Sequence, residues 1–424
     1  MTPIRDPDFF WGVANAAFQT EGELGDSDWS RWTSQPGKVF DGTKPNDTFG
    51  FYRNYEREFD TTVDLGGNAF RLSVAWERIE PSPGKYDESA LDHYEKMIVA
   101  LRARGIEPFV TLHHFVNPAW LEGGILNSEF PDRFADFSEK VVRRLSAAPA
   151  SVKWWTTLNE PVVLTVAGYL DGQFPPGRKN DLKGAIEGLA QMVRAHIRAL
   201  NRIRRLPGGK DLKIGVATHW RPFEPLRAWS PLDWITSRIS ENFFNRQLTR
   251  GILTGKYRIS IPGAGTVRGE EKIEGGGPGA DYFGINYYGR TLVKFTWRAP
   301  FVAVSEGPGV KNDLGWEIHP EGLYDSLRQV KAYGLPILIT ENGVADAEDS
   351  RRANALRDHI AQIDRAISEG IDVRGYFHWT LTDNFEWANG FGPKFGLCLA
   401  EGNDSKRYRP SFGVYRDSIR AHRK

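Results

Sequence analysis

The chain has 424 residues, 40% of them hydrophobic, with 55 Lys and Arg residues against 54 Asp and Glu residues. It is long enough to bury a large core, and its net charge of +1 offers no general attraction for nucleic acid or an anionic membrane. The single cysteine, Cys398, cannot form an internal disulfide, and no apolar run approaches the roughly 18 residues of a membrane span. Residues Met1 to Pro7 lack the basic-then-apolar layout of a signal peptide, so we expect a cytoplasmic protein.

Apolar runs alternate along the chain with segments of helical character. The runs rich in β-branched and aromatic residues predict strands over residues 9–14, 68–74, 106–112, 154–160, 213–218, 282–288, 336–340 and 375–379. Helical spacing or composition predicts helices over residues 48–64, 91–101, 131–145, 185–206, 234–250, 323–330 and 356–367. The alternation is held from one end of the chain to the other.

Eight strand-then-helix units without an intervening linker predict one closed (β/α)8 TIM barrel, in a single domain over residues 1–424. A doubly wound parallel sheet is the alternative. The Gly-rich segment 263–279 and the segment 298–313 interrupt the period. We expect both to be inserted loops that are either lids or mobile.

Two of the predicted strands end in a glutamate. Glu160 ends the fourth and is followed by Pro161, which favours an extended residue before it and predicts that Glu160 stands at the strand tip. Glu341 ends the seventh strand. Because the carboxyl ends of barrel strands share one mouth, these two carboxylates are expected to face each other. Such a pair indicates glycosidic bond cleavage, with retention at a separation of roughly 5–5.5 Å and inversion at about 6.5–9.5 Å.

The segment Thr157 to Pro161 resembles the acid/base motif of glycoside hydrolase family 1 enzymes of the β-glucosidase type. Ile339 to Gly343 resembles the nucleophile motif of the same family. Phe10 to Gly22 and Gly375 to Gly396 are similar to its opening strand and its closing sugar-binding segment, so the resemblance covers essentially the whole chain. It implies a retaining double displacement with Glu341 as nucleophile and Glu160 as acid and then base.

The resemblance also implies roles for other strand-end residues. Arg71, Asn286 and Tyr288 would hold Glu341 ionised and oriented. The residues implied to bind the sugar by hydrogen bonds are Gln19, His114, Asn159, Glu386 and Trp387, with Trp379 stacking beneath the ring and Trp316 in the aglycone site. Asn159 would contact the 2-hydroxyl. Taken one at a time, each of these residues has an equally good structural explanation, and only their joint position at strand ends favours a site.

The chemistry requires no cofactor, and a metal site at His113 and His114 is not expected, because adjacent strand residues face opposite sides. Glu386 occupies the place where phosphoglycosidases carry basic residues, and it would repel a phosphate. We therefore expect an unphosphorylated terminal β-glucosyl, β-galactosyl or β-fucosyl residue in a small glycoside or oligosaccharide. The segment from His113 to Val116 and the residue Ile125 depart from many relatives, so the glycone and aglycone preference stays open, as does the oligomeric state.

Two other functions share these residues. One is a non-catalytic sugar-binding barrel, which the presence of both Glu160 and Glu341 disfavours. The other is an enzyme used mainly for transglycosylation, in which another alcohol intercepts the glycosyl-enzyme.

Overall fold

The computed structural model describes residues 6–298, 302–401 and 405–423, and its centre is a closed barrel of eight parallel strands. The order around the barrel is β1-β13-β12-β9-β5-β4-β3-β2. In chain order these strands are β1 (Phe10–Ala14), β2 (Ala69–Ser73), β3 (Glu107–His113), β4 (Trp154–Asn159), β5 (Lys213–His219), β9 (Tyr282–Tyr287), β12 (Ile337–Asn342) and β13 (Val373–Trp379). The predicted TIM barrel is confirmed, and the doubly wound alternative is wrong.

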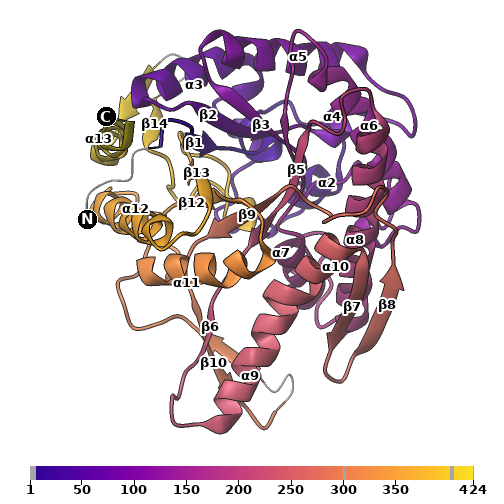
Figure 1. Cartoon of the computed structure of the whole chain (residues 1–424), viewed down its shortest axis with the longest axis vertical. Helices are drawn as coiled ribbons and strands as arrows, with labels where there is room; N and C mark the ends of the chain where they lie inside the picture. The colour runs from indigo at the N-terminus through magenta and orange to yellow at the C-terminus, as the bar shows by residue number, and fades with distance from the viewer. Residues whose placement is uncertain (1–5, 299–301, 402–404, 424) are drawn as a thin grey trace.

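Amphipathic helices surround the barrel, as Figure 1 shows for α5, α6, α11 and α12. The longer helices are α3 (Phe51–Leu65), α5 (Glu88–Ala103), α6 (Phe130–Ser146), α8 (Leu182–Arg205), α9 (Pro231–Glu241), α10 (Leu248–Thr254), α11 (Pro320–Val330), α12 (Arg352–Ser368) and α13 (Pro410–Arg423). Short helices α1 (Ala17–Thr20), α2 (Asp28–Thr33), α4 (Trp76–Ile79) and α7 (Pro161–Thr165) lie in the connections after strands β1, β2 and β4. No helix among the described residues is both long and apolar enough to cross a membrane.

The two segments expected to be loops contain strands instead. Strand β8 (Gly265–Glu270) lies within the Gly-rich segment and forms an antiparallel hairpin with β7 (Lys256–Ile261). Strand β11 (Val302–Ser305) lies within the second segment and joins β10 (Thr291–Phe295) and β6 (Phe223–Pro225) in a small sheet. Residues 299–301 of that segment lie outside the described residues. A further hairpin pairs β14 (Cys398–Glu401) with β15 (Ser405–Tyr408).

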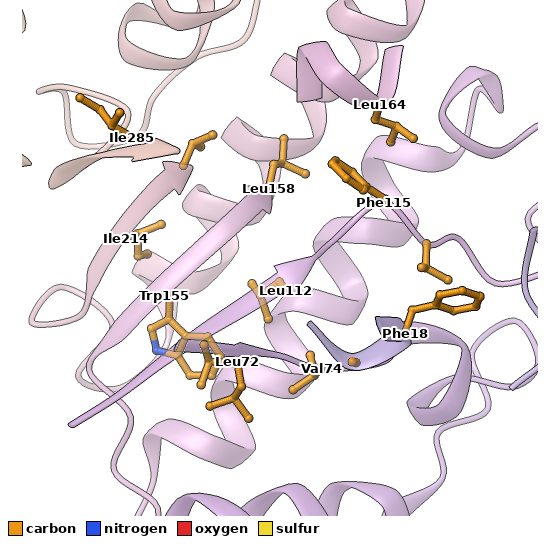
Figure 2. Close-up of a cluster of buried hydrophobic side chains, with 14 of the residues drawn as sticks. Phe18, Leu72, Val74, Leu112, Phe115, Trp155, Leu158, Leu164, Ile214 and Ile285 are labelled. Carbon is orange, nitrogen blue, oxygen red and sulfur yellow. The ribbon is translucent and has the colours of Figure 1, made fainter. Parts of the chain in front are cut away.

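Side-chain alternation separates two apolar clusters. Outward-facing strand residues such as Leu72, Leu112 and Trp155 join the large core between barrel and helices, part of which Figure 2 shows. Inward-facing residues fill the barrel itself, where Phe109 packs against Trp154 and Phe377 with ring centroids 5.1 and 4.8 Å apart. This aromatic filling makes the barrel a packed core, so the space open to a ligand lies above it, at the carboxyl ends of the strands.

Candidate active site

A pocket of about 280 Å³ opens at the carboxyl ends of the barrel strands. Ten of the twelve predicted site residues line it: Gln19, His114, Asn159, Glu160, Tyr288, Trp316, Glu341, Trp379, Glu386 and Trp387. The other two, Arg71 and Asn286, are fully buried and make hydrogen bonds to its lining. Ile125 does not line this pocket.

Glu341 reaches the pocket through an irregularity in β12. Leu338 faces the barrel interior and Ile339 the outer core, so strict alternation would turn Glu341 outward. The register against β9 shifts between Ile339 and Glu341, and this local irregularity directs the carboxylate inward. Thr340 also faces inward and donates a hydrogen bond to Asn286 Oδ1 over 2.6 Å.

The Glu341 carboxylate is buried between a cation and a phenol. Arg71 Nη1 lies 2.5 Å from Oε1, and Tyr288 donates its hydroxyl proton to Oε2 over 2.8 Å. Burial raises the pKa of Glu341 to about 7, Arg71 and Tyr288 oppose this rise, and nearby Glu160 adds to it. Arg71 and Tyr288 therefore contact Glu341 as expected, but burial outweighs their tendency to keep it ionised.

Glu160 does not have the extended backbone that Pro161 led us to expect. Its φ of 46° and ψ of 54° place it in the left-handed region, between the end of β4 and the start of α7. The conformation is costly for a residue with a side chain. It reverses the chain direction at once, so that the carboxylate lines the pocket while Pro161 begins the helix.

Asn286 lies against Glu160, not Glu341. Its amide Nδ2 donates to Glu160 Oε1 over 2.7 Å and to Asn159 Oδ1 over 3.1 Å. The expectation that Asn286 supports Glu341 is therefore wrong in its partner. Asn286 is the backbone neighbour of Glu341 in the pairing of β9 with β12. Its side chain nevertheless points toward the end of β4, so it contacts Glu160 instead.

Asn159 connects the surroundings of both carboxylates. Its Oδ1 accepts a hydrogen bond from Arg71 Nη2 over 2.7 Å, and its Nδ2 donates to His114 Nε2 over 3.1 Å. The ring proton of a neutral His114 must then lie on Nδ1. Burial and the Arg71 charge lower the pKa of His114 well below its usual range, which keeps the ring neutral.

Several buried polar atoms of the pocket have no partner among the described residues. Gln19 donates from Nε2 to the Phe385 carbonyl over 2.8 Å, but its Oε1 is unpaired, as is His114 Nδ1. Trp379 donates from Nε1 to Glu386 over 3.0 Å, and burial raises the pKa of Glu386 to about 8. Because buried polar atoms are normally paired, the unpaired atoms indicate a ligand rich in hydroxyl groups.

The two adjacent histidines at the end of β3, of which His113 is its last residue, point in different directions. His114 stacks with Trp379 and Trp387 in the pocket, whereas His113 packs against Phe130 and Phe134 outside it. Among the described residues, no group of three His, Cys, Asp or Glu side chains is placed to hold a metal ion.

The end of β5 also contributes to the pocket, although none of its residues was predicted to. His219 and Arg221, at and just beyond the end of that strand, line the pocket together with Phe244. The strand itself was predicted, so the rule that strand ends form the site would have found His219. The other lining residues that were missed lie in the segments that follow the strands: Phe115, Val163, Val166, Ala167, Asp171, Gln173, Phe174, Leu314, Ala388, Asn389 and Phe395. The resemblance of Gly375 to Gly396 to a sugar-binding segment was the one signal that covered the last three.

A parallel barrel that brings two buried carboxylates, unpaired polar atoms and stacked tryptophans into one pocket defines the class of TIM-barrel glycoside hydrolases. The chain belongs to glycosyl hydrolase family 1, whose model matches residues 4–424.

Known proteins are similar to the chain over nearly its whole length. Beta-glucosidase A of Thermotoga maritima is 34% identical over 448 residues, with 97% of this chain and 96% of that protein covered. A beta-galactosidase of Saccharolobus solfataricus is 30% identical, with 96% and 94% covered. The solved structure of a beta-glucosidase from Thermotoga maritima in complex with glucoimidazole has a TM-score of 0.89 at 31% identity and covers 99% of both chains.

Proposed function

We propose that the protein is a retaining β-glycosidase that hydrolyses terminal β-D-glucosyl residues, and also β-galactosyl and β-fucosyl residues, of small glycosides. The observation that carries the proposal is the different environment of the two carboxylates. Glu341 contacts Arg71 and Tyr288, whereas Glu160 contacts the neutral amide of Asn286. An arginine suits a group that must act as an anion, and a neutral partner suits one that must carry a proton first and lose it later.

In the first step, Glu341 attacks the anomeric carbon while Glu160 donates a proton to the departing oxygen. The bond to the aglycone breaks as the glycosyl ester forms. In the second step, Glu160 takes a proton from water, which attacks the anomeric carbon and releases Glu341 as a carboxylate. Two displacements restore the β configuration. Formation of the ester removes the negative charge of Glu341, which makes it easier for Glu160 to remain ionised as the base.

The same geometry supports roles for the sugar-binding residues. Gln19, His114 and Glu386 would accept from and donate to the glycone hydroxyls, with Trp387 beside them and Trp379 under the ring. Asn159 would contact the 2-hydroxyl, where a hydrogen bond strengthens at the transition state. Trp316, whose ring contacts Tyr288 at 6.0 Å between centroids, would border the aglycone.

The proposed substrate is unphosphorylated. Glu386 lies within the pocket beside Trp379 and leaves no basic group at its position to pair with a phosphate. The names of the beta-glucosidase and beta-galactosidase relatives support the glucosyl and galactosyl preference. Transfer to an alcohol other than water is a secondary activity that the same ester intermediate permits. We further infer one domain over residues 1–424 and a cytoplasmic location.

The replacement Glu341→Gly tests the nucleophile. We expect it to abolish hydrolysis of an aryl β-glucoside while circular dichroism shows an unchanged fold, because no other group can form the ester. Product analysis of the unaltered enzyme by NMR should show the β anomer first. Unchanged turnover of the variant, or an α anomer as the first product, would contradict the proposal.

The replacement Glu160→Ala tests the acid and base. We expect substrates with poor leaving groups to lose most activity, typically 10²-fold or more, since they depend on proton donation. Azide should restore turnover of substrates with good leaving groups, because it attacks the ester without needing a base. Equal losses across leaving groups would count against this role.

A further inference from the structure

We infer that His219 is a positioning residue for Glu160, held by Arg221 in the tautomer that directs an N–H group toward one oxygen of that carboxylate. This inference rests on the proposed role of Glu160. It adds two residues, at and just beyond the end of β5, to a mechanism otherwise built on residues at the ends of β2, β4, β9 and β12.

The position of the His219 ring is tightly determined. It stacks on Tyr288, with centroids 5.8 Å apart and planes 26° apart, and makes an edge-to-face contact with Phe244, with planes 84° apart. Its Nδ1 lies 3.6 Å from Glu160 Oε1. The ring is buried, so it approaches Glu160 as a fixed element of the pocket wall and not as a mobile surface group.

The tautomer follows from the other ring nitrogen. Arg221 Nε, which can only donate, lies 3.2 Å from His219 Nε2, so Nε2 must accept. The proton of a neutral ring is therefore on Nδ1 and faces Glu160. Burial lowers the pKa of His219 and the Arg221 charge acts in the same direction, which outweighs the opposing effect of Glu160 and keeps the ring neutral. Arg221 itself is held by Thr291, to which its Nη1 donates over 3.0 Å.

This arrangement distinguishes the two oxygens of Glu160. Oε1 accepts from Asn286 Nδ2 and faces His219 Nδ1, so donors already occupy that side. Oε2 has no hydrogen-bond partner among the residues that the structure describes. A proton carried by Glu160 therefore belongs on Oε2, the oxygen left free for the leaving group. When Glu160 acts as the base, the two donors instead stabilise the carboxylate that they face.

Other titratable and charged groups lie near His219 and Glu160, and the variants used as tests should leave those groups unchanged. The titratable and charged groups around His219 and Glu160 are Arg221, Tyr288, Glu341, Asp171, Glu386 and Glu306.

The test compares His219→Phe, which keeps an aromatic ring but removes the donor, with His219→Asn, whose amide nitrogen can occupy the place of Nδ1. We expect His219→Phe to move the alkaline limb of kcat/KM upward by about one pH unit, because loss of a donor disfavours the ionised carboxylate. It should also slow kcat about tenfold near neutral pH for 4-nitrophenyl β-glucoside, if deglycosylation limits that substrate, since a smaller fraction of Glu160 is then ionised to act as the base. In His219→Asn, kcat should stay within about twofold, and the alkaline limb within about 0.3 pH unit, of the values for the unaltered enzyme. An unchanged alkaline limb in His219→Phe, or equal shifts in the two variants, would overturn the inference.

A second measurement uses the unaltered enzyme, so it does not depend on whether His219→Phe folds. Nitrogen-15 NMR of the histidine-labelled enzyme, with the His219 signals assigned by their loss in His219→Asn, should show a protonated Nδ1 and an unprotonated Nε2. A protonated Nε2 would overturn the inference even if His219→Phe fails to fold. Azide rescue of Glu160→Ala distinguishes failure of the Glu160 proposal from failure of the His219 inference. If azide does not restore turnover, the proposed role of Glu160 is wrong. If azide restores turnover but the His219 proton is found on Nε2, only the role of His219 is wrong.

Discussion

At the scale of single residues, the contact between Arg71 and Glu341 is the most consequential in the pocket. Both side chains are almost inaccessible, 1% and 4% exposed, so neither charge has water to replace its partner. Arg71 also holds Asn159 through its second terminal nitrogen. One guanidinium thus orients the carboxylate proposed to attack the sugar and the amide proposed to bind the 2-hydroxyl.

Replacement Arg71→Met should lower the free energy of unfolding by about 3–5 kcal/mol at pH 8, because it leaves Glu341 buried without its cation. The loss should be smaller at pH 5, where protonation of Glu341 relieves the unpaired charge. The pKa of Glu341, about 7 with Arg71 present, should rise, and the acidic limb of kcat/KM should rise with it. Urea unfolding and a pH–rate profile measure both effects. Arg71→Lys retains the charge and should recover most of the stability, but it cannot contact Glu341 and Asn159 at once as the guanidinium does. Equal losses of stability in Arg71→Met at pH 5 and pH 8 would contradict this account.

At the scale of elements, the short helix α2 supports the pocket from behind. It begins with a capping box in which Ser27 Oγ accepts from the Ser30 backbone and Ser30 Oγ accepts from the Ser27 backbone. Its Trp29 is fully buried and packs against Trp387 of the pocket, with ring centroids 4.6 Å apart. The stability of this helix is therefore connected to the position of a proposed sugar-binding residue.

Replacement Ser27→Ala should cost about 1 kcal/mol of stability through the lost cap. If α2 positions Trp387, it should also raise KM about threefold, the equivalent of roughly 0.6 kcal/mol of binding. Asp87→Ala is the matched control, because Asp87 caps α5 by accepting from the Ser89 and Ala90 backbones on an exposed part of the molecule. It should lose similar stability with no change in KM. A raised KM in Asp87→Ala as well would show that general destabilisation is the cause.

At the scale of the whole molecule, buried titratable groups of two kinds shape the stability. Burial raises the pKa of carboxyl groups to about 7 or 8, at Glu21, Asp28, Glu341 and Glu386. Burial lowers the pKa of imidazoles to about 3 or 4, at His113, His196, His359 and His378. In both kinds the folded protein favours the neutral form.

These two groups of residues change the stability in opposite directions. As pH rises from 4 to 6.5, unfolded histidines lose the protons that the folded ones never held, and this stabilises the fold. From about pH 4.5 to 7, and to about 8 for Glu386, unfolded carboxyl groups are ionised while the folded ones keep their protons, and this destabilises the fold. Each proton of difference is worth about 1.4 kcal/mol per pH unit. The two effects nearly cancel between about pH 4.5 and 6, and only the carboxyl effect persists above pH 6.5, so stability should be nearly level up to about pH 6 and then fall toward pH 8.

Urea denaturation between pH 5 and pH 9 measures this curve. Replacement Glu386→Gln removes the group whose pKa is about 8 and should flatten the decline above pH 6.5. The exposed replacement Glu56→Gln is the control and should leave the shape unchanged. Stability that rises steadily through pH 8 would contradict the assignment of neutral buried carboxyl groups.

The barrel and ten of the residues that line the pocket could be predicted from the amino-acid sequence, but more than half of the lining could not. Alternation of apolar runs with helical segments is a local property, and eight repeats leave little choice but a closed barrel. Once strand ends share a mouth, residues as distant as Gln19 and Trp387 can be assigned to one site without measuring any distance. The hairpin of β7 and β8 escaped this reasoning because Gly-rich composition indicates a loop unless pairing with a second segment is known.

The contacts between individual side chains in the pocket became known only from the folded arrangement of the strands. Strict alternation would turn Glu341 away from the pocket, and Pro161 predicts an extended Glu160, but a register shift and a left-handed residue direct both carboxylates inward. Asn286 supports Glu160 instead of Glu341, and His219 joins the pocket from a strand end that the sequence analysis passed over. The physical reason is that such contacts depend on pairing between strands and on local backbone irregularities, and neither leaves a periodic signal in the chain.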